Sequence, residues 1–169
     1  RRTLREPLVN ALLHDPMPAP RRQAATTLYR SDFSRSTDGW TVGNEGGASS
    51  QLSISNGALE LAVHRLGNEG WHVQLVKPSV PLVQGRMYRV TFTASATEIR
   101  EATLYVGRAA APWDCYSAYR TITFVPRRET YSVVFTMQGP SDPRARLVFD
   151  LGQSTAGVSI GSVVVEEVE

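Results

Sequence analysis

The segment Leu52-Ser53-Ile54-Ser55-Asn56-Gly57-Ala58-Leu59-Glu60-Leu61 decides the fold class, because an Asn-Gly pair separates two runs of alternating apolar and polar residues. Asn-Gly is the strongest short-range signal for a two-residue hairpin turn. Folding the segment about this turn pairs Ile54 with Leu59 and Leu52 with Leu61. All four apolar side chains then share one face, so the segment predicts a β-hairpin with one buried side.

The same two-residue period continues along the chain from Thr26 onward. Clusters of Gly, Pro, Asn and Asp separate the further predicted strands, which are 71–76, 88–96, 102–108, 121–125, 131–137, 145–151 and 158–166. No helical period occurs after residue 25. Many short strands at this spacing predict an all-β fold, a two-sheet antiparallel β-sandwich of the jelly-roll type.

The first 25 residues differ from the rest. Thr3-Leu4-Arg5-Glu6 has the form of a helix capping box, and Pro16, Pro18 and Pro20 prevent a helix from continuing. We therefore divide the chain into a short N-terminal helical arm with a Pro/Arg linker, residues 1–25, and a β-sandwich domain, residues 26–169.

Composition excludes several classes of function. The chain has 169 residues, a net charge of +2 and one cysteine, Cys115. Its basic residues are scattered, which is not the footprint of a nucleic-acid partner. No apolar run approaches the ~20 residues that cross a membrane. A single cysteine allows neither an intramolecular disulfide nor a thiolate metal cage.

No arrangement of catalytic groups stands out either. The acidic residues do not form a catalytic pair, and the histidines lack metal-ligand spacing. His64 and His72 flank a glycine-containing turn, where a surface metal site is conceivable and plain polar surface is the simpler interpretation. Asp32 and Asp38 lie in an early loop, where a carboxylate could help to hold a structural Ca²⁺. We expect no enzyme activity, no cofactor and no catalytic metal.

Alternation along the strands also predicts which side chains point away from the core. Trp71 is expected to point inward, whereas His72, Gln74, Arg89 and Asp150 are expected on an outward polar face. This face is either ordinary solvated surface or the floor of a polar binding groove.

The stretch Ala111-Pro112-Trp113-Asp114-Cys115-Tyr116-Ser117-Ala118-Tyr119-Arg120 places three aromatic residues in one loop between strands. Sugar rings stack their C–H faces on aromatic rings, and their hydroxyls bind planar polar groups. Loops on rigid sandwiches often carry binding residues. Trp113, Tyr116 and Tyr119 are therefore candidate ligand contacts, with the alternative that Trp113 caps an open end of the sandwich. Trp40 and Trp71 are expected in the core.

An ordered series of segments resembles the carbohydrate-binding modules of families 4, 9 and 22. The likeness covers roughly residues 28–168, and its segments are Asp38-Gly39-Trp40, Trp71-His72-Val73-Gln74-Leu75, Gly85-Arg86-Met87-Tyr88-Arg89-Val90-Thr91-Phe92, Tyr131-Ser132-Val133-Val134-Phe135 and Arg146-Leu147-Val148-Phe149-Asp150-Leu151-Gly152.

The resemblance implies a jelly roll whose concave sheet binds a polysaccharide chain of the β-glucan or xylan class. Gln74 then matches a polar groove residue, and Trp113 and Tyr116 fall in the loop that often carries sugar platforms. Asp150 replaces an amide that is frequent in the family. Gly161-Ser162-Val163 replaces a family Asp-Asp-Val sequence that contributes to a structural Ca²⁺ site. The resemblance also implies a secreted, extracellular protein of bacterial type, accessory to a glycoside hydrolase.

Two non-enzymatic functions follow. The first is a glycan-binding module that uses Trp113, Tyr116, Tyr119, Gln74, His72, Asp150 and Arg89. The alternative is a structural β-sandwich that docks onto a neighbouring catalytic domain or partner protein through residues 1–25. Deleting that arm distinguishes the two, since only a self-sufficient module would still bind sugar.

Overall fold

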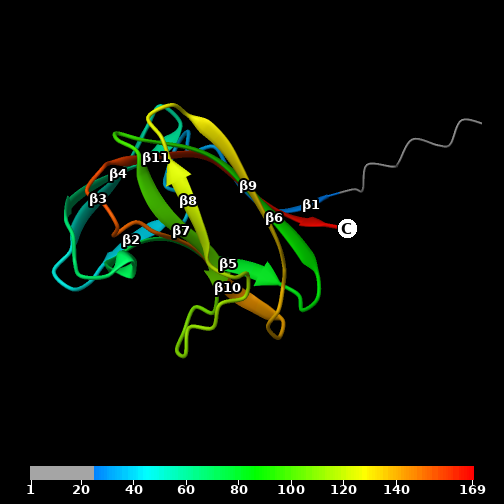
Figure 1. The fold of residues 1–169 in the computed structure, drawn as a ribbon. Coiled ribbons are helices and arrows are strands. Elements are labelled where there is room, and N and C mark those ends of the chain that lie inside the picture. The colour runs from blue at the N-terminus through cyan, green and yellow to red at the C-terminus, as the bar shows by residue number, and fades with distance from the viewer. Residues whose placement is uncertain (1–24) are drawn as a thin grey trace, which may run out of the picture.

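The computed structural model describes residues 25–169, and the strands of this part of the chain form two antiparallel sheets (Figure 1). The helical arm predicted within residues 1–25 lies outside the described residues except for residue 25 itself. In sheet A, the strand order is β3-β4-β11-β6-β9, with β1 also paired to β11. In sheet B, the order is β2-β5-β10-β7-β8.

The strands of sheet A are β1 (Thr26–Ser31), β3 (Ser49–Ser55), β4 (Ala58–Arg65), β6 (Met87–Ala96), β9 (Glu129–Thr136) and β11 (Val158–Val168). Those of sheet B are β2 (Thr41–Asn44), β5 (Val73–Leu82), β7 (Arg100–Gly107), β8 (Arg120–Phe124) and β10 (Asp142–Asp150). A single 3₁₀ turn, η1 (Gly70–His72), precedes β5.

The predicted hairpin is confirmed as β3–β4. Ile54 pairs with Leu59 and Leu52 pairs with Leu61. Asn56 and Gly57 both adopt positive φ angles, 50° and 71°. A two-residue turn of this handedness matches the right-handed twist of the strands that it joins.

The core lies between the two sheets and follows the period of two. In β6, for example, Tyr88, Val90 and Phe92 are buried, whereas the intervening side chains are partly exposed. Phe149 of sheet B meets Phe92 of sheet A edge-on, with ring centroids 5.0 Å apart. Trp40 is buried as predicted and lies 5.8 Å from Phe149. The all-β sandwich predicted from the sequence is confirmed.

One strand is longer than predicted. β5 runs on to Leu82 through Pro78 and Pro81, although the sequence predicted an end at Val76. Strand β2 pairs only with Val73–Val76, so beyond Val76 no strand within residues 25–169 pairs with this edge of β5. Proline lacks an amide hydrogen and is tolerated where no neighbouring strand needs that donor.

Among residues 25–169, no helix is long and apolar enough to span a membrane.

Candidate functional site

A cavity of about 600 Å³ opens on the face of sheet B that points away from the core. Its lining combines aromatic and polar side chains, namely Glu45, Trp71, Gln74, Tyr105, Trp113, Tyr119, Arg146 and Asp150. Strands β5, β7 and β10 supply the floor. The aromatic walls come from η1 and from the loop between β7 and β8. Cavities with a few convergent polar groups among aromatic rings are the usual form of a small-ligand site.

Three side chains on neighbouring strands form the hydrogen-bonded floor of this cavity. Gln74 is the register partner of Asp150 across β5 and β10. The Nε2 of Gln74 donates to Asp150 Oδ1 at 3.0 Å and to the Tyr105 hydroxyl at 3.0 Å. Tyr105 in turn donates to the same Asp150 oxygen at 3.4 Å. The floor donors are thus used internally, and the oxygens Gln74 Oε1 and Asp150 Oδ2 remain as acceptors for a ligand.

The pKa values of this floor are shifted by burial. Desolvation raises the pKa of Asp150, against the lowering effect of hydrogen bonds from Gln74 and Tyr105. Burial, followed by the charge of Asp150, raises the pKa of the Tyr105 phenol well above its ordinary value. The Tyr105 hydroxyl therefore keeps its proton near neutral pH and serves as the donor that orients Asp150.

Exposed aromatic rings form the walls. Trp71 is 45% exposed, Trp113 is 53% exposed and Tyr119 is 62% exposed. The Tyr119 ring lies 4.9 Å from the Tyr105 ring, tilted by 60°. Exposed apolar side chains that gather in one patch, unlike scattered ones, are typical of ligand-binding grooves and interaction surfaces.

Arg146 packs against the ring of Trp113 in the wall of the cavity. Its guanidinium carbon lies 4.8 Å above the centre of the Trp113 ring, a cation–π contact. The ion pairs of the described residues include no carboxylate bound to Arg146. Arg146 therefore brings hydrogen-bond donors to a cavity whose floor offers mainly acceptors.

Four of the seven predicted site residues come together in this cavity. They are Trp113, Tyr119, Gln74 and Asp150. The alternative that Trp113 caps an open end of the sandwich does not describe its position, because it lies over the outer face of sheet B beside Arg146.

The structure places the other three predicted residues elsewhere. Tyr116 is 4% exposed and belongs to the core, where its hydroxyl donates to Asp142 Oδ2 at 2.8 Å. Arg89 lies in β6, which belongs to sheet A, and its guanidinium donates to Glu166. His72 ends η1 and is 9% exposed, so its side chain does not line the cavity.

Sequence reasoning also missed four lining residues. Arg146 carried a signal, because it lies between the buried residues Ala145 and Leu147 and so points outward. Tyr105 lies between Leu104 and Val106 and is itself 7% exposed, so burial in β7 does not alternate at this position. Trp71 was predicted to point inward, which is wrong, because the two-residue period begins only at Val73 and Trp71 belongs to the 3₁₀ turn. Glu45 follows β2 in a turn and carried no signal in the sequence.

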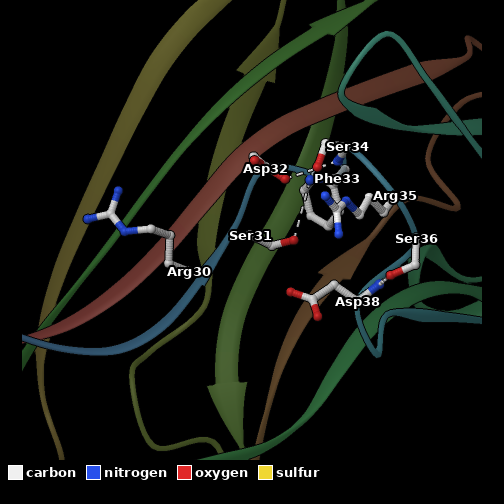
Figure 2. A pocket seen from close by; sticks show the side chains of 8 residues that line it. All are labelled: Arg30, Ser31, Asp32, Phe33, Ser34, Arg35, Ser36 and Asp38. Atoms are coloured by element: carbon white, nitrogen blue, oxygen red, sulfur yellow. Dashed lines mark hydrogen bonds between the residues drawn. The ribbon is translucent and has the colours of Figure 1, made fainter.

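The loop that was considered for calcium forms a separate hollow of about 360 Å³ between β1 and β2 (Figure 2). The carboxylates of Asp32 and Asp38 lie apart in this view, and Asp32 Oδ1 accepts the backbone N–H of Ser34 at 3.0 Å. Arg30 and Arg35 line the same hollow. Within residues 25–169, no three His, Cys, Asp or Glu side chains gather closely enough to hold a metal ion. These residues do not fit a Ca²⁺ ion, which requires several converging oxygen ligands.

Replacing Asp150 by asparagine is expected to stabilise the protein at neutral pH. Asparagine keeps an Oδ1 acceptor for Gln74 and Tyr105, and it removes a charge that burial disfavours. The pKa of Asp150 is higher in the folded protein than in the unfolded chain. Asp150 therefore contributes most to the free energy of unfolding below its ordinary pKa of about 3.9, where it is protonated in both states. This contribution is lost as the pH rises through the folded-state pKa.

Urea unfolding of the native protein and Asp150→Asn at pH 7 and pH 3 measures this effect. We expect the variant to be the more stable protein at pH 7 and its advantage to shrink at pH 3. An advantage of the same size at both pH values would show that the charge of Asp150 is not its cause.

Comparison with known proteins supports the fold and the family. The model of a family described as carbohydrate binding domain matches residues 25–157. No curated protein sequence matches the chain at a significant level.

Several solved structures share the architecture. A structure described as "CBM4 structure and function" has a TM-score of 0.72 and 20% identity, and the alignment covers 82% of this chain and 94% of that one. The second N-terminal cellulose-binding domain of Cellulomonas fimi β-1,4-glucanase C has a TM-score of 0.71 and 21% identity, with 87% and 97% covered. The CBM22-1 xylan-binding domain of Paenibacillus barcinonensis Xyn10C has a TM-score of 0.60 and 14% identity, with 87% and 97% covered.

At these identities the likeness to solved structures establishes the fold, and the family match extends over most of the sandwich. The resemblance stated from the sequence is confirmed, and the chain belongs to the carbohydrate-binding domain family of the 4/9 type.

Proposed function

We propose that this chain is a non-catalytic module that binds a polysaccharide of the β-glucan or xylan class in a groove on the outer face of sheet B. One observation carries the proposal, which is the combination of three exposed aromatic rings with the Gln74–Tyr105–Asp150 floor in a single cavity. Aromatic rings offer apolar faces for the C–H side of a pyranose, and the floor oxygens and Arg146 suit its hydroxyl groups.

The arrangement of the lining favours a neutral glycan. Asp150 and Glu45 contribute two carboxylates to the cavity, and Arg146 contributes one guanidinium. An acidic polysaccharide would bring further negative charge to the partly buried Asp150, at an electrostatic cost. Neutral sugar hydroxyls can instead donate to Asp150 and Gln74 and accept from Arg146.

Titration calorimetry with soluble β-glucans, xylans and mannans tests the proposal. We expect heat of binding with at least one neutral polysaccharide. Trp113→Ala and Trp71→Ala are each expected to weaken binding by about tenfold or more, or about 1.4 kcal/mol. Each ring is about half exposed, so the loss in the free energy of unfolding should stay below the cost of truncating a buried tryptophan, about 3–5 kcal/mol, and urea unfolding of each variant checks this.

Val134→Ala is the matched control, because Val134 is a 40% exposed apolar residue on sheet A. This variant should bind as the native protein does. Unchanged affinity in both tryptophan variants would remove the sheet B cavity from the function. If no polysaccharide of the panel binds, the alternative is favoured, in which the sandwich docks onto a neighbouring domain or partner protein.

We further propose that the module serves a secreted glycoside hydrolase and that residues 1–25 act as a linker. A structurally similar chain from Clostridium thermocellum joins a CBM22-1 module to a GH10 module and is described in complex with xylohexaose. That likeness has a TM-score of 0.59, and this chain covers 29% of it. The accessory role is supported by this arrangement in a structurally similar chain, which is 11% identical to this one, and by the family match.

A further inference from the structure

His72 lies directly behind the wall of the sheet B cavity and has no part in its lining. Its Nδ1 accepts the backbone N–H of Asn68 at 2.9 Å and that of Glu69 at 3.2 Å. Nδ1 is the acceptor in both hydrogen bonds. The ring thus satisfies two amides of the loop between β4 and η1.

The backbones of two glycines in neighbouring loops pack closely against the His72 ring. Gly67 belongs to the β4–η1 loop and Gly46 to the turn after β2. A Cβ atom on either glycine would overlap the imidazole ring. Gly46 also has a φ of 60°, which favours glycine. The close approach of both backbones therefore makes the His72 ring the point at which the two loops meet.

The same residue is connected to two parts of the cavity wall. The Trp71 ring contacts the His72 ring edge-to-face, with centroids 4.4 Å apart and an angle of 77°. The backbone carbonyl of His72 accepts the N–H of Glu45 at 2.8 Å. Trp71 and Glu45 both line the cavity. The His72 ring thus contacts one lining residue directly, and the His72 backbone is hydrogen-bonded to a second.

We propose that His72 is a positioning residue of the glycan site. It keeps the Trp71 ring and the turn that contains Glu45 in the orientation needed to contact a bound sugar ring. The inference rests on the proposed function and assigns His72 an indirect role. It contrasts with the direct contact predicted from the sequence, because the imidazole is used to join the loops and not to bind the ligand.

Two substitutions of His72 separate its role as a hydrogen-bond acceptor from the packing of its ring, and a third substitution, at Gly67, displaces the ring. His72→Leu fills much of the volume and leaves the amides of Asn68 and Glu69 without an acceptor. His72→Asn loses ring volume and keeps an oxygen close to the position of Nδ1. Gly67→Ala leaves His72 in place and displaces its ring through the overlap described above.

Calorimetry with cellohexaose and xylohexaose gives the first readout. We expect His72→Leu and Gly67→Ala to weaken binding by about tenfold, or about 1.4 kcal/mol, and His72→Asn to lie within about threefold of the native protein. His64→Leu is the control, since His64 is an exposed histidine on β4, and it should bind as the native protein does.

A second readout needs no sugar and keeps the two proposals distinguishable. The backbone N–H of Glu45, which donates to the His72 carbonyl, should exchange with solvent at least about tenfold faster in His72→Leu and Gly67→Ala than in the native protein, and at close to the native rate in His72→Asn. If the native protein binds no member of the polysaccharide panel, the proposed function fails, and the exchange rate of the Glu45 amide still decides whether His72 positions this wall of the cavity. A native exchange rate of the Glu45 amide in His72→Leu, or equal impairment of the Asn and Leu variants, would overturn the positioning role.

Discussion

Replacing Arg100 by leucine is expected to lower the free energy of unfolding by about 3–5 kcal/mol. Arg100 begins β7 and is 4% exposed. Its guanidinium donates to the backbone carbonyls of Leu151 at 2.7 Å, Ala156 at 2.7 Å and Ser154 at 2.9 Å. The leucine variant would leave these carbonyls without their donors in a buried setting, and each such loss costs about 1–3 kcal/mol.

The contacts of Arg100 explain why the β10–β11 loop depends on it. No carboxylate among the described residues forms an ion pair with Arg100. Burial lowers the pKa of its guanidinium to about 10, which leaves the group charged near neutral pH. The carbonyls of the loop therefore provide the compensation for a buried charge. The same loop contacts η1 through the N–H of Gly152, which donates to the Gly70 carbonyl at 2.8 Å.

Urea unfolding of Arg100→Leu, Arg100→Lys and Arg127→Leu tests this account. Lysine has one ammonium group where arginine has a planar fork, so we expect a loss smaller than that of leucine but still clear. Arg127 is 84% exposed and pairs with Glu129 on the surface, and its loss should cost less than about 1 kcal/mol. A loss below about 1 kcal/mol in Arg100→Leu would contradict the structural role.

Replacing Phe149 by alanine is expected to cost a similar amount, about 3–5 kcal/mol. Phe149 is fully buried in β10, and its ring lies edge-on to Phe92 at 5.0 Å and near Trp40 at 5.8 Å. The contact with Phe92 joins sheet B to sheet A. Alanine would remove this contact and leave a cavity between the sheets, which the close-packed neighbours can fill only in part.

Phe149→Leu is the matched control, since it keeps an apolar side chain of intermediate volume. We expect it to cost about 1–2 kcal/mol, clearly less than alanine. Chemical unfolding gives both values, provided that the urea dependence of the free energy is unchanged between the variants. Equal and small losses in both variants would mean that the two sheets do not depend on this contact.

Local signals in the sequence were sufficient for much of the fold. The Asn56-Gly57 turn determined the register of β3 and β4, because a two-residue turn leaves one pairing in which the apolar side chains share a face. Alternation identified the buried sides of β6 and β10 for the same reason, and the ordered series of segments predicted the family that the comparisons confirm. Gln74 and Asp150 were correctly placed on an outward face of their strands.

The alternation of apolar and polar residues does not indicate which sheet a strand belongs to. The prediction of Arg89 as a site residue was wrong for this reason. Its side chain does point outward, but β6 lies in sheet A, opposite the sheet that carries Gln74 and Asp150. Pairing between strands distant in sequence depends on the packing of the whole sandwich, which no local pattern encodes. In loops even the direction of a side chain could not be predicted, because loops have no regular period. Tyr116 and Tyr119 are three residues apart in one loop, and the first is buried whereas the second is exposed.

The sequence by itself thus determined the strand period, the hairpin register, the apolar faces and the family, since these follow from neighbouring residues and their spacing. The tertiary structure alone decided that Trp71 faces outward, that His72 lies buried behind it, and that Trp113, Tyr119, Gln74 and Asp150 share one cavity. The physical reason is that a binding surface joins side chains from separate strands and loops, and only the pairing of β5, β7 and β10 in one sheet brings them within reach of the same ligand.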